Sequence, residues 1–234
     1  MIRPKMQIIF QDPYSSLNPR FTVERIIGEA ISVHGLAQGN DLQKKIETLL
    51  EKVGLSRMYL KRYAHEFSGG QRQRIGIARA LALNPKYIVC DEPVSALDVS
   101  IQAQIINLLQ SLQKEDNLSL MFISHDLNVV KHLSQRTAVM YLGKIVEMAP
   151  TELINRKAAH PYTQALLASK PSLDPTDRKR PKPLQGDVPS PLNPPSGCHF
   201  HPRCPKVVDR CKTEIPRQIE LEEGHTVHCH LYDE

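Results

Sequence analysis

Long apolar runs are missing from this sequence. No stretch approaches the ~18 apolar residues that a bilayer-spanning helix needs. The first ten residues also lack the apolar stretch and small-residue cleavage site of a signal peptide. We therefore expect a cytoplasmic protein whose contact with a membrane comes through partner proteins.

Runs of like charge are scarce as well. The 30 Lys and Arg residues outnumber the 25 Asp and Glu residues only slightly, for a formal net charge of +5, and they are scattered along the chain. One short basic cluster, at residues 178–182, lies among prolines. We interpret it as a solvated linker rather than a contact for nucleic acid or anionic lipid, so no nucleic-acid partner is expected.

Cysteine is sparse, and four of the five cysteines follow residue 160. Cytosolic thiols stay reduced, which favours a metal site over disulfides. The spacing is C-x5-C-x6-C-x17-C, formed by Cys198, Cys204, Cys211 and Cys229. It lacks the tight C-x2-C pairs typical of zinc and iron–sulfur sites, so the spacing alone is weak support. Cys90 lies in an apolar run and is expected to be a packing residue.

Helical and strand patterns alternate over the first two thirds of the chain. Apolar periodicity predicts helices at 41–53, 71–83 and 100–115, buried strands at 87–90 and 118–123, and a hairpin over 137–148 that turns at Gly143. This order indicates an α/β fold with a largely parallel sheet and right-handed crossovers.

The composition changes near residue 160. Twelve of the 18 prolines lie between Pro161 and Glu234, together with the four clustered cysteines. We therefore predict an α/β domain over residues 1–155 and a second region over 156–234. That second region combines a proline-rich linker at 171–196 with a small cysteine-bearing tail.

A glycine-rich turn directly precedes the helix predicted at 71–83. Its residues are Ser68, Gly69, Gly70 and Gln71. Glycine lets the backbone approach an oxyanion, and the exposed amides at the start of a helix favour phosphate. Alone, such a turn is also a common helix cap.

Acidic and imidazole side chains follow the two predicted strands. Asp91 and Glu92 come after the first strand, at the edge of a parallel sheet where ligands bind. An aspartate there can hold Mg²⁺ through its water shell, and the next glutamate can orient or deprotonate an attacking water. Asp98 follows within the Ser-Ala-Leu-Asp segment. His125 follows the second strand, where an imidazole can contact a terminal phosphate.

In this order, the motifs resemble the signature sequence, Walker B, D-loop and switch histidine of the ABC-transporter ATPase family. Residues 7–13 resemble its Q-loop, which makes Gln11 the candidate sensor of Mg²⁺. The resemblance implies a P-loop NTPase-type ABC nucleotide-binding domain that uses ATP and Mg²⁺, with Glu92 and His125 as catalytic residues.

The resemblance also implies a head-to-tail dimer with a second ABC ATPase subunit. The signature residues Ser68, Gly69 and Gly70 would serve nucleotide bound mainly by the partner, whereas Asp91, Glu92, Gln11 and His125 would serve the chain's own nucleotide. Closing and opening of this dimer would drive two transmembrane permease subunits.

Three further segments resemble the oligopeptide, dipeptide and nickel importers of this family: residues 11–20, 160–167 and 186–204. This resemblance implies an extracytoplasmic peptide-binding protein as a partner and a peripheral position on the cytoplasmic face of the inner or plasma membrane. It also implies a [4Fe–4S] cluster on the four tail cysteines, with Zn²⁺ or no metal as open alternatives.

The phosphate-binding string Gly-x-x-x-x-Gly-Lys-Ser/Thr occurs nowhere in the 234 residues. In the family this string lies upstream of the Q-loop, so we expect an N-terminally truncated chain that is inactive alone and leaves an apolar sheet face uncovered. Two alternatives stay open: a catalytically incompetent fragment or regulatory metal-binding module, and a DNA-repair-type ABC ATPase. The long coiled coils of DNA-repair ATPases are missing here, and nucleotide binding by the isolated chain separates the enzyme from the fragment.

Overall fold

The computed structural model describes residues 2–169 and 184–233 and divides into two compact units, Met1–His125 and Asp126–Glu234. The division expected at residues 155 and 156 stays a prediction. The basic cluster at 178–182 and the first part of the expected linker, up to residue 183, lie outside the described residues.

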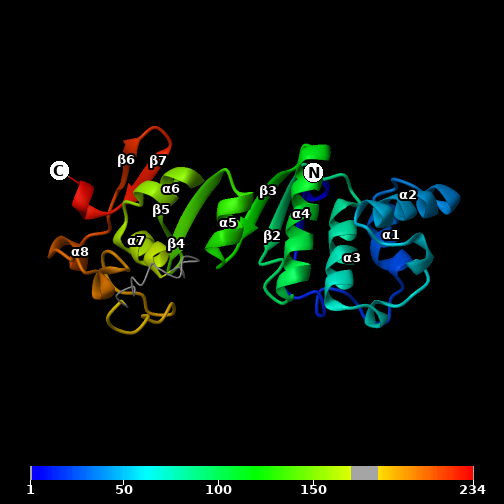
Figure 1. The fold of residues 1–234 in the computed structure, drawn as a ribbon, viewed down its shortest axis with the longest axis horizontal. Coiled ribbons are helices and arrows are strands. Elements are labelled where there is room, and N and C mark those ends of the chain that lie inside the picture. Colours follow the sequence, from blue (N-terminus) through cyan, green and yellow to red (C-terminus); the bar gives the residue numbers. More distant parts are fainter. Residues whose placement is uncertain (1, 170–183, 234) are drawn as a thin grey trace, which may run out of the picture. The chain divides into compact units, whose positions relative to one another are not determined.

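The first unit is a parallel sheet covered by helices. Its elements are β1 Met6–Ile9, α1 Val23–Val33, α2 Gly39–Lys52, α3 Gly69–Leu81, β2 Tyr87–Asp91, α4 Val99–Glu115 and β3 Ser119–Ile123. The strands pair in the order β1-β2-β3, all parallel. Helices α3 and α4 lie side by side, and α1 and α2 pack against α3 (Figure 1). The helices and strands expected in this unit are confirmed, and their ends differ from the expected ones by at most two residues.

Gly54 shows why the second helix ends where it does. Its φ of 72° is a left-handed conformation, which strains residues with a side chain. A Cβ atom at this position would also lie 3.0 Å from Nη1 of Arg74. That same nitrogen donates to the carbonyl oxygen of Val53 at 2.6 Å, so the turn ties the end of α2 to α3.

The core of the first unit lies between its helices and one face of the sheet. Its fully buried side chains include Ile27, Ile31, Ile46, Leu50, Ile75, Ile77, Ile88, Ile105 and Leu109. Burying one such side chain contributes about 1.5–3 kcal/mol. Helices α1 and α2 approach closely at Gly28, where an added Cβ would lie 3.0 Å from Cδ1 of Ile46.

The opposite face of this sheet is apolar and exposed. Met6 and Ile8 of β1 are 49% and 39% exposed, and Met121 and Ile123 of β3 are 49% and 40% exposed. Alternate residues of a strand share a face, and the register aligns Ile8, Val89 and Met121 across the three strands. The expectation of an uncovered apolar sheet face is therefore confirmed for the described residues.

The second unit is built on an antiparallel sheet. Its elements are α5 Leu127–Leu133, β4 Arg136–Tyr141, β5 Lys144–Pro150, α6 Thr151–Lys157, α7 Pro161–Ala168, α8 Arg210–Thr213, β6 Gln218–Glu222 and β7 His225–His228. The strand order is β4-β5-β7-β6. The expected hairpin is confirmed, and Leu142 and Gly143 form its turn with φ values of 42° and 75°. The β6–β7 hairpin was not expected.

A buried carboxylate holds this unit together. Glu147 of β5 is fully buried, and its Oε1 accepts hydrogen bonds from the Ala159 backbone N at 2.7 Å and from Nε2 of His225 at 2.8 Å. Its Oε2 accepts from the backbone N of His160 at 2.9 Å. One side chain thus joins β5, β7 and the segment that begins α7.

Aromatic rings form a second core in this unit. The ring centroid of Tyr141 lies 5.2 Å from that of Phe200 and 4.7 Å from that of Tyr162, with Val139 and Val146 buried beside them. The rings belong to β4, α7 and the cysteine-bearing segment. That segment is therefore packed onto the hairpin and α7.

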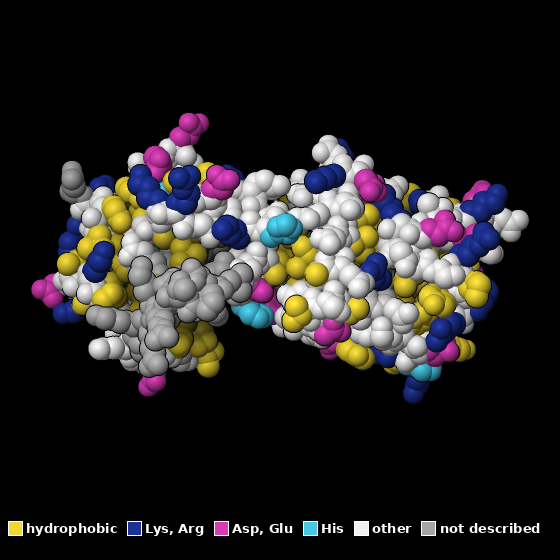
Figure 2. Space-filling model, viewed as in Figure 1, with side chains coloured by type: hydrophobic (Ala, Val, Ile, Leu, Met, Phe, Trp, Pro, Cys, Tyr) yellow, Lys and Arg dark blue, Asp and Glu magenta, His cyan; other side chains and the backbone are white. Residues whose placement is uncertain are grey.

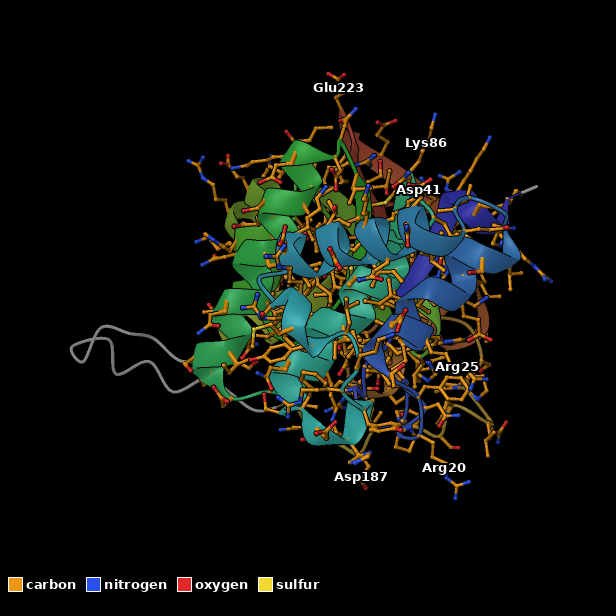
Figure 3. The ribbon with its side chains drawn as sticks, turned by 90° about the vertical axis from the view of Figure 1, so that its right-hand side faces the viewer. Arg20, Arg25, Asp41, Lys86, Asp187 and Glu223 are labelled. Atoms are coloured by element: carbon orange, nitrogen blue, oxygen red, sulfur yellow. The ribbon has the colours of Figure 1, made fainter. Side chains whose placement is uncertain are left out.

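The surface charges agree with the scattered pattern of the sequence. Figure 2 shows basic and acidic side chains interspersed on the face that it draws. Arg20, Arg25, Asp41 and Lys86 are exposed side chains of the first unit, labelled in Figure 3. Among the described residues, no helix combines the length and the apolarity that a bilayer span requires.

Candidate functional site

The three parallel strands of the first unit bring the expected site residues to one edge of the sheet. Gln11 lies two residues beyond β1, Asp91 ends β2, and His125 lies two residues beyond β3. Parallel strands have their carboxyl ends at the same edge. Residues more than eighty positions apart in the chain are therefore neighbours.

Glu92 is the centre of this edge. Nε2 of Gln11 donates to Oε2 of Glu92 at 3.1 Å, and Nδ1 of His125 lies 3.2 Å from Oε1. The Glu92 side chain is 25% exposed, whereas that of His125 is 73% exposed. The carboxylate is thus held by two polar groups and still reaches solvent, which is what the activation of a water molecule requires.

The backbone at Glu92 has an uncommon conformation. Its φ is 42°, in the left-handed region that residues with a side chain rarely adopt. Its backbone N donates to the carbonyl oxygen of Ile123 at 3.1 Å, and Oγ of Ser95 donates to its carbonyl oxygen at 3.0 Å. These two hydrogen bonds stabilise the strained conformation. Strained backbone of this kind is common at functional sites, where the surrounding structure holds it in place.

Asp91 and Gln11 offer oxygen ligands at the same edge. Asp91 is half-buried as the last residue of β2, and it pairs in register with Ile123 of β3. Mg²⁺ prefers carboxylate and amide oxygens and binds through few protein ligands. These two side chains fit that preference.

The glycine-rich turn begins α3, as expected. Oγ of Ser68 accepts from the backbone N of Gln71 at 3.4 Å, and Oε1 of Gln71 accepts from the backbone N of Ser68 at 3.1 Å. This reciprocal pair is a capping box. The two side chains cap the helix, which leaves the backbone amides of the turn as its groups for an anion.

Close packing leaves little room for a side chain at either glycine of this turn. A Cβ on Gly70 would lie 2.5 Å from Cγ2 of Ile101, a distance at which something must shift. A Cβ on Gly69 would lie 3.3 Å from the hydroxyl oxygen of Tyr14. The glycines therefore let α3 approach α4 and the loop after β1.

Asp98 caps the next helix. Its Oδ1 accepts from the backbone N of Ile101 at 3.0 Å and from Oγ of Ser100 at 3.0 Å. These hydrogen bonds, the backbone bond foremost, lower the pKa of Asp98 below its ordinary value. In this structure its role is to begin α4 directly after the Glu92 segment.

The structure therefore brings only some of the predicted site residues into contact with one another. Gln11, Glu92 and His125 are in contact, whereas Ser68 and Gln71 bond each other and Asp98 bonds its own helix. The expected roles of these residues toward nucleotide stay predictions. Sequence reasoning missed the contacts of Tyr14 and Arg72, since no periodic pattern links two residues so far apart.

The tail cysteines lie in one region of the second unit. Burial first, and then the charges of the other three tail cysteines, raise the pKa of Cys229 to about 11. Burial likewise raises the pKa of Cys198 and Cys204. All four are free thiols. Across residues 2–169 and 184–233, however, no group of three or more His, Cys, Asp or Glu side chains is placed to hold a metal ion.

Cys90 differs from these four. It is fully buried in β2, and burial raises its pKa to about 12. The expectation that Cys90 is a packing residue is confirmed.

Two family profiles match the chain. The profile described as "ABC transporter" matches residues 1–95, and the profile described as "Oligopeptide/dipeptide transporter, C-terminal region" matches residues 146–211. The first covers the turn before α3 and the carboxylates after β2. The second covers β5 from Val146 onward and the first three tail cysteines.

Similar proteins extend the match over nearly the whole chain. The "Oligopeptide transport ATP-binding protein AppF" of Bacillus subtilis is 53% identical over 99% of this chain, which spans 71% of that protein. A "Probable peptide ABC transporter ATP-binding protein" of Sinorhizobium fredii is 55% identical over 98% of this chain. The chain spans 65% of the length of the Sinorhizobium relative, slightly under two thirds.

Among solved structures, the chain is similar to cbiO1 from Clostridium perfringens, part of the ABC transporter complex cbiONQ. The TM-score is 0.58 with 26% sequence identity, over 67% of this chain and 61% of that one. This likeness agrees with the α/β architecture of the first unit.

Proposed function

Because the chain belongs to the ABC transporter ATPase family, in its oligopeptide/dipeptide branch, we propose that it is an ATP-hydrolysing subunit that powers peptide import. The observation that carries the proposal is the meeting of Gln11, Glu92 and His125 at the carboxyl edge of the parallel sheet. The cargo class rests on the match of the tail to the oligopeptide/dipeptide profile.

Glu92 is the catalytic residue of this proposal, as general base for the attacking water. Its carboxylate is partly exposed and oriented on both oxygens, by the Gln11 amide and the His125 ring. His125 is highly exposed, so its ring can contact the terminal phosphate of ATP while it positions Glu92. When bound, Mg²⁺ supplies charge neutralisation at the phosphates, and Asp91 and Gln11 would hold it.

The turn before α3 serves a second nucleotide in this proposal. The amides of Gly69 and Gly70 lie at the start of a 13-residue helix, where the helix dipole and free N–H groups favour phosphate. That nucleotide is held mainly by a second ABC ATPase subunit in a head-to-tail dimer. Two permease subunits and an extracytoplasmic peptide-binding protein complete the importer, with this chain peripheral on the cytoplasmic face of the membrane.

ATP turnover also needs a phosphate-binding loop. The 234 residues contain no Gly-x-x-x-x-Gly-Lys-Ser/Thr string, whose backbone and lysine hold the β and γ phosphates. We therefore expect these residues to hydrolyse ATP only where such a loop is supplied in the assembly, and not alone.

The test is ATP hydrolysis by the importer assembled in vesicles with its permeases and peptide-binding protein. The proposal predicts hydrolysis that rises when the binding protein carries peptide, and accumulation of peptide inside the vesicles. Hydrolysis that responds to DNA and ignores peptide would contradict it. The 234-residue chain alone, in the same assay, is expected to show none.

For the tail, we propose that Cys198, Cys204, Cys211 and Cys229 hold a metal centre, a [4Fe–4S] cluster rather than Zn²⁺. Support comes from their grouping, since the charges of Cys198, Cys204 and Cys211 act on Cys229, and from the oligopeptide/dipeptide profile, which covers the first three of them. The described residues hold no preformed metal group, so the thiols must move closer together when metal binds.

Anaerobic purification tests the tail proposal. The protein is expected to be brown and to contain iron and acid-labile sulfide, and Cys211→Ala should lose both. Cys90→Ala is the matched control, since Cys90 is buried in the other unit, and it should keep them. A colourless protein with stoichiometric zinc would favour Zn²⁺, and one without metal would contradict any centre.

A further inference from the structure

The loop after β1 has a fixed shape. Oδ1 of Asp12 accepts from the backbone N of Tyr14 at 2.7 Å, and Oδ2 accepts from the backbone N of Ser15 at 3.2 Å. These bonds, led by that of Tyr14, lower the pKa of Asp12 below its ordinary value. The carboxylate thus stays ionised at neutral pH and holds the turn that presents Tyr14.

Tyr14 lies against the first turn of α3. The guanidinium carbon of Arg72 is 4.3 Å from the centre of the Tyr14 ring, within the range of a cation–π contact. The Tyr14 hydroxyl reaches Gly69, where an added Cβ would lie only 3.3 Å from it. The Tyr14 side chain therefore lies beside the glycine turn and over Arg72 of the helix that follows.

Arg72 also holds the backbone that leads into the turn. Its Nε donates to the carbonyl oxygen of Phe67 at 2.9 Å, and its Nη2 donates to that of His65 at 2.9 Å. The guanidinium is thus fixed by two hydrogen bonds while its face covers the Tyr14 ring. A displacement of the Tyr14 ring would therefore also move Arg72, and through it the backbone of Phe67 and His65 before Ser68.

A second arginine fixes the other end of the loop. Nη1 of Arg79 donates to the carbonyl oxygen of Ser16 at 2.6 Å, and its guanidinium carbon lies 5.8 Å from the ring centre of Phe10. Arg72 and Arg79 are seven residues apart and so share one face of α3. The loop is held along two turns of this helix.

Between these attachments lies Gln11, whose amide donates to Glu92. We infer that Tyr14 is a positioning residue that links the placement of the Ser68–Gly70 turn to the Gln11–Glu92 contact, so that the two ATP-facing parts of the first unit move together. This inference rests on the proposed function for the role of both parts in ATP hydrolysis. The physical clamp itself, formed by Tyr14, Arg72 and Arg79, is independent of that role.

Amide hydrogen exchange on the 234-residue chain tests the clamp. Tyr14→Leu removes the ring and is expected to speed exchange at residues 71–74 by about 3- to 10-fold, the range of a partly desolvated cation–π contact. Tyr14→Phe keeps the ring and should stay within about 2-fold of wild type, since the same contact remains. Leu36→Ala is the control, because Leu36 is another exposed apolar side chain of the first unit and lies just beyond the end of α1, far in sequence from the clamp residues.

Two results of this experiment would overturn the clamp. One is exchange at residues 71–74 that is unchanged in Tyr14→Leu or equally changed in Leu36→Ala. The other is faster exchange throughout the first unit, which would indicate general destabilisation rather than positioning.

Kinetics of the assembled importer test the role in turnover. Tyr14→Leu should lower kcat for ATP by about 3- to 10-fold and leave KM within about 2-fold, because the turn acts after ATP is bound, and Tyr14→Phe should restore kcat. A rise in KM at constant kcat would contradict the positioning role. An assembly with the wild-type chain that hydrolyses no ATP would contradict the proposed function, whereas the clamp is judged by hydrogen exchange alone.

Discussion

Glu92→Gln in the assembled importer is expected to lower ATP turnover by about 100- to 10,000-fold, the contribution of a positioned general base. Glutamine keeps the size of the side chain and its contacts with Gln11 and His125, but it cannot take a proton from water. Nucleotide binding should persist, so ATP-bound dimer accumulates. The measurement is phosphate release beside retention of labelled ATP on the complex.

Glu115→Gln serves as the control for this prediction. Glu115 is an exposed carboxylate of the same unit at the last turn of α4, the end of this 17-residue helix opposite to Asp98. Its substitution should leave turnover within about 2-fold of wild type, as is usual for surface positions. Normal turnover in Glu92→Gln would show that Glu92 is not the base.

The second large effect is expected at Glu147. Glu147→Ala removes the buried acceptor of three hydrogen bonds and leaves His225 Nε2 and the backbone N–H groups of Ala159 and His160 without a partner. Breaking a buried charged network from one side costs about 3–5 kcal/mol. We therefore expect the second unit to unfold at a much lower urea concentration than in the wild type. Hydrogen exchange of the β5 and β7 amides measures this unfolding.

Asp209→Asn is the comparison for Glu147. Asp209 pairs with Lys212 at 2.8 Å, but the side chains are 99% and 57% exposed, and exposed pairs contribute about 0–1 kcal/mol. Loss of this exposed ion pair should lower the urea concentration at which the second unit unfolds only slightly. If Glu147→Ala costs less than about 1 kcal/mol, the buried network does not hold the unit together.

Local sequence patterns predicted the helices and strands that have a clear apolar periodicity. They also predicted the contacts that follow from the parallel order of the strands. Helices α3 and α4 and strands β2 and β3 follow from apolar periodicity and from breakers such as Asn84, whose φ is 49°. The meeting of Glu92 and His125 follows from the parallel order of their strands. Side chains that follow neighbouring parallel strands must share an edge.

Contacts between distant segments were not predictable in this way. The pairing of β5 with β7 joins Met148 to Thr226 and depends on packing that only the whole second unit supplies. A weak signal for the missed hairpin does exist, since Ile219 and Leu221 alternate with acids before Glu223-Gly224. The ring of Tyr14 over Arg72 leaves no signal in a single sequence.

The strand order β4-β5-β7-β6 has a consequence for synthesis of the chain. Strand β5 ends at Pro150, but its neighbour β7 begins only at His225. At roughly 5–20 residues per second on the ribosome, one edge of β5 waits for several seconds before its partner emerges. During that interval β5 is paired with β4 alone, and its Glu147 lacks His225 as a partner. The second unit is therefore expected to complete its fold late, with chaperones covering β5 until the β6–β7 hairpin arrives.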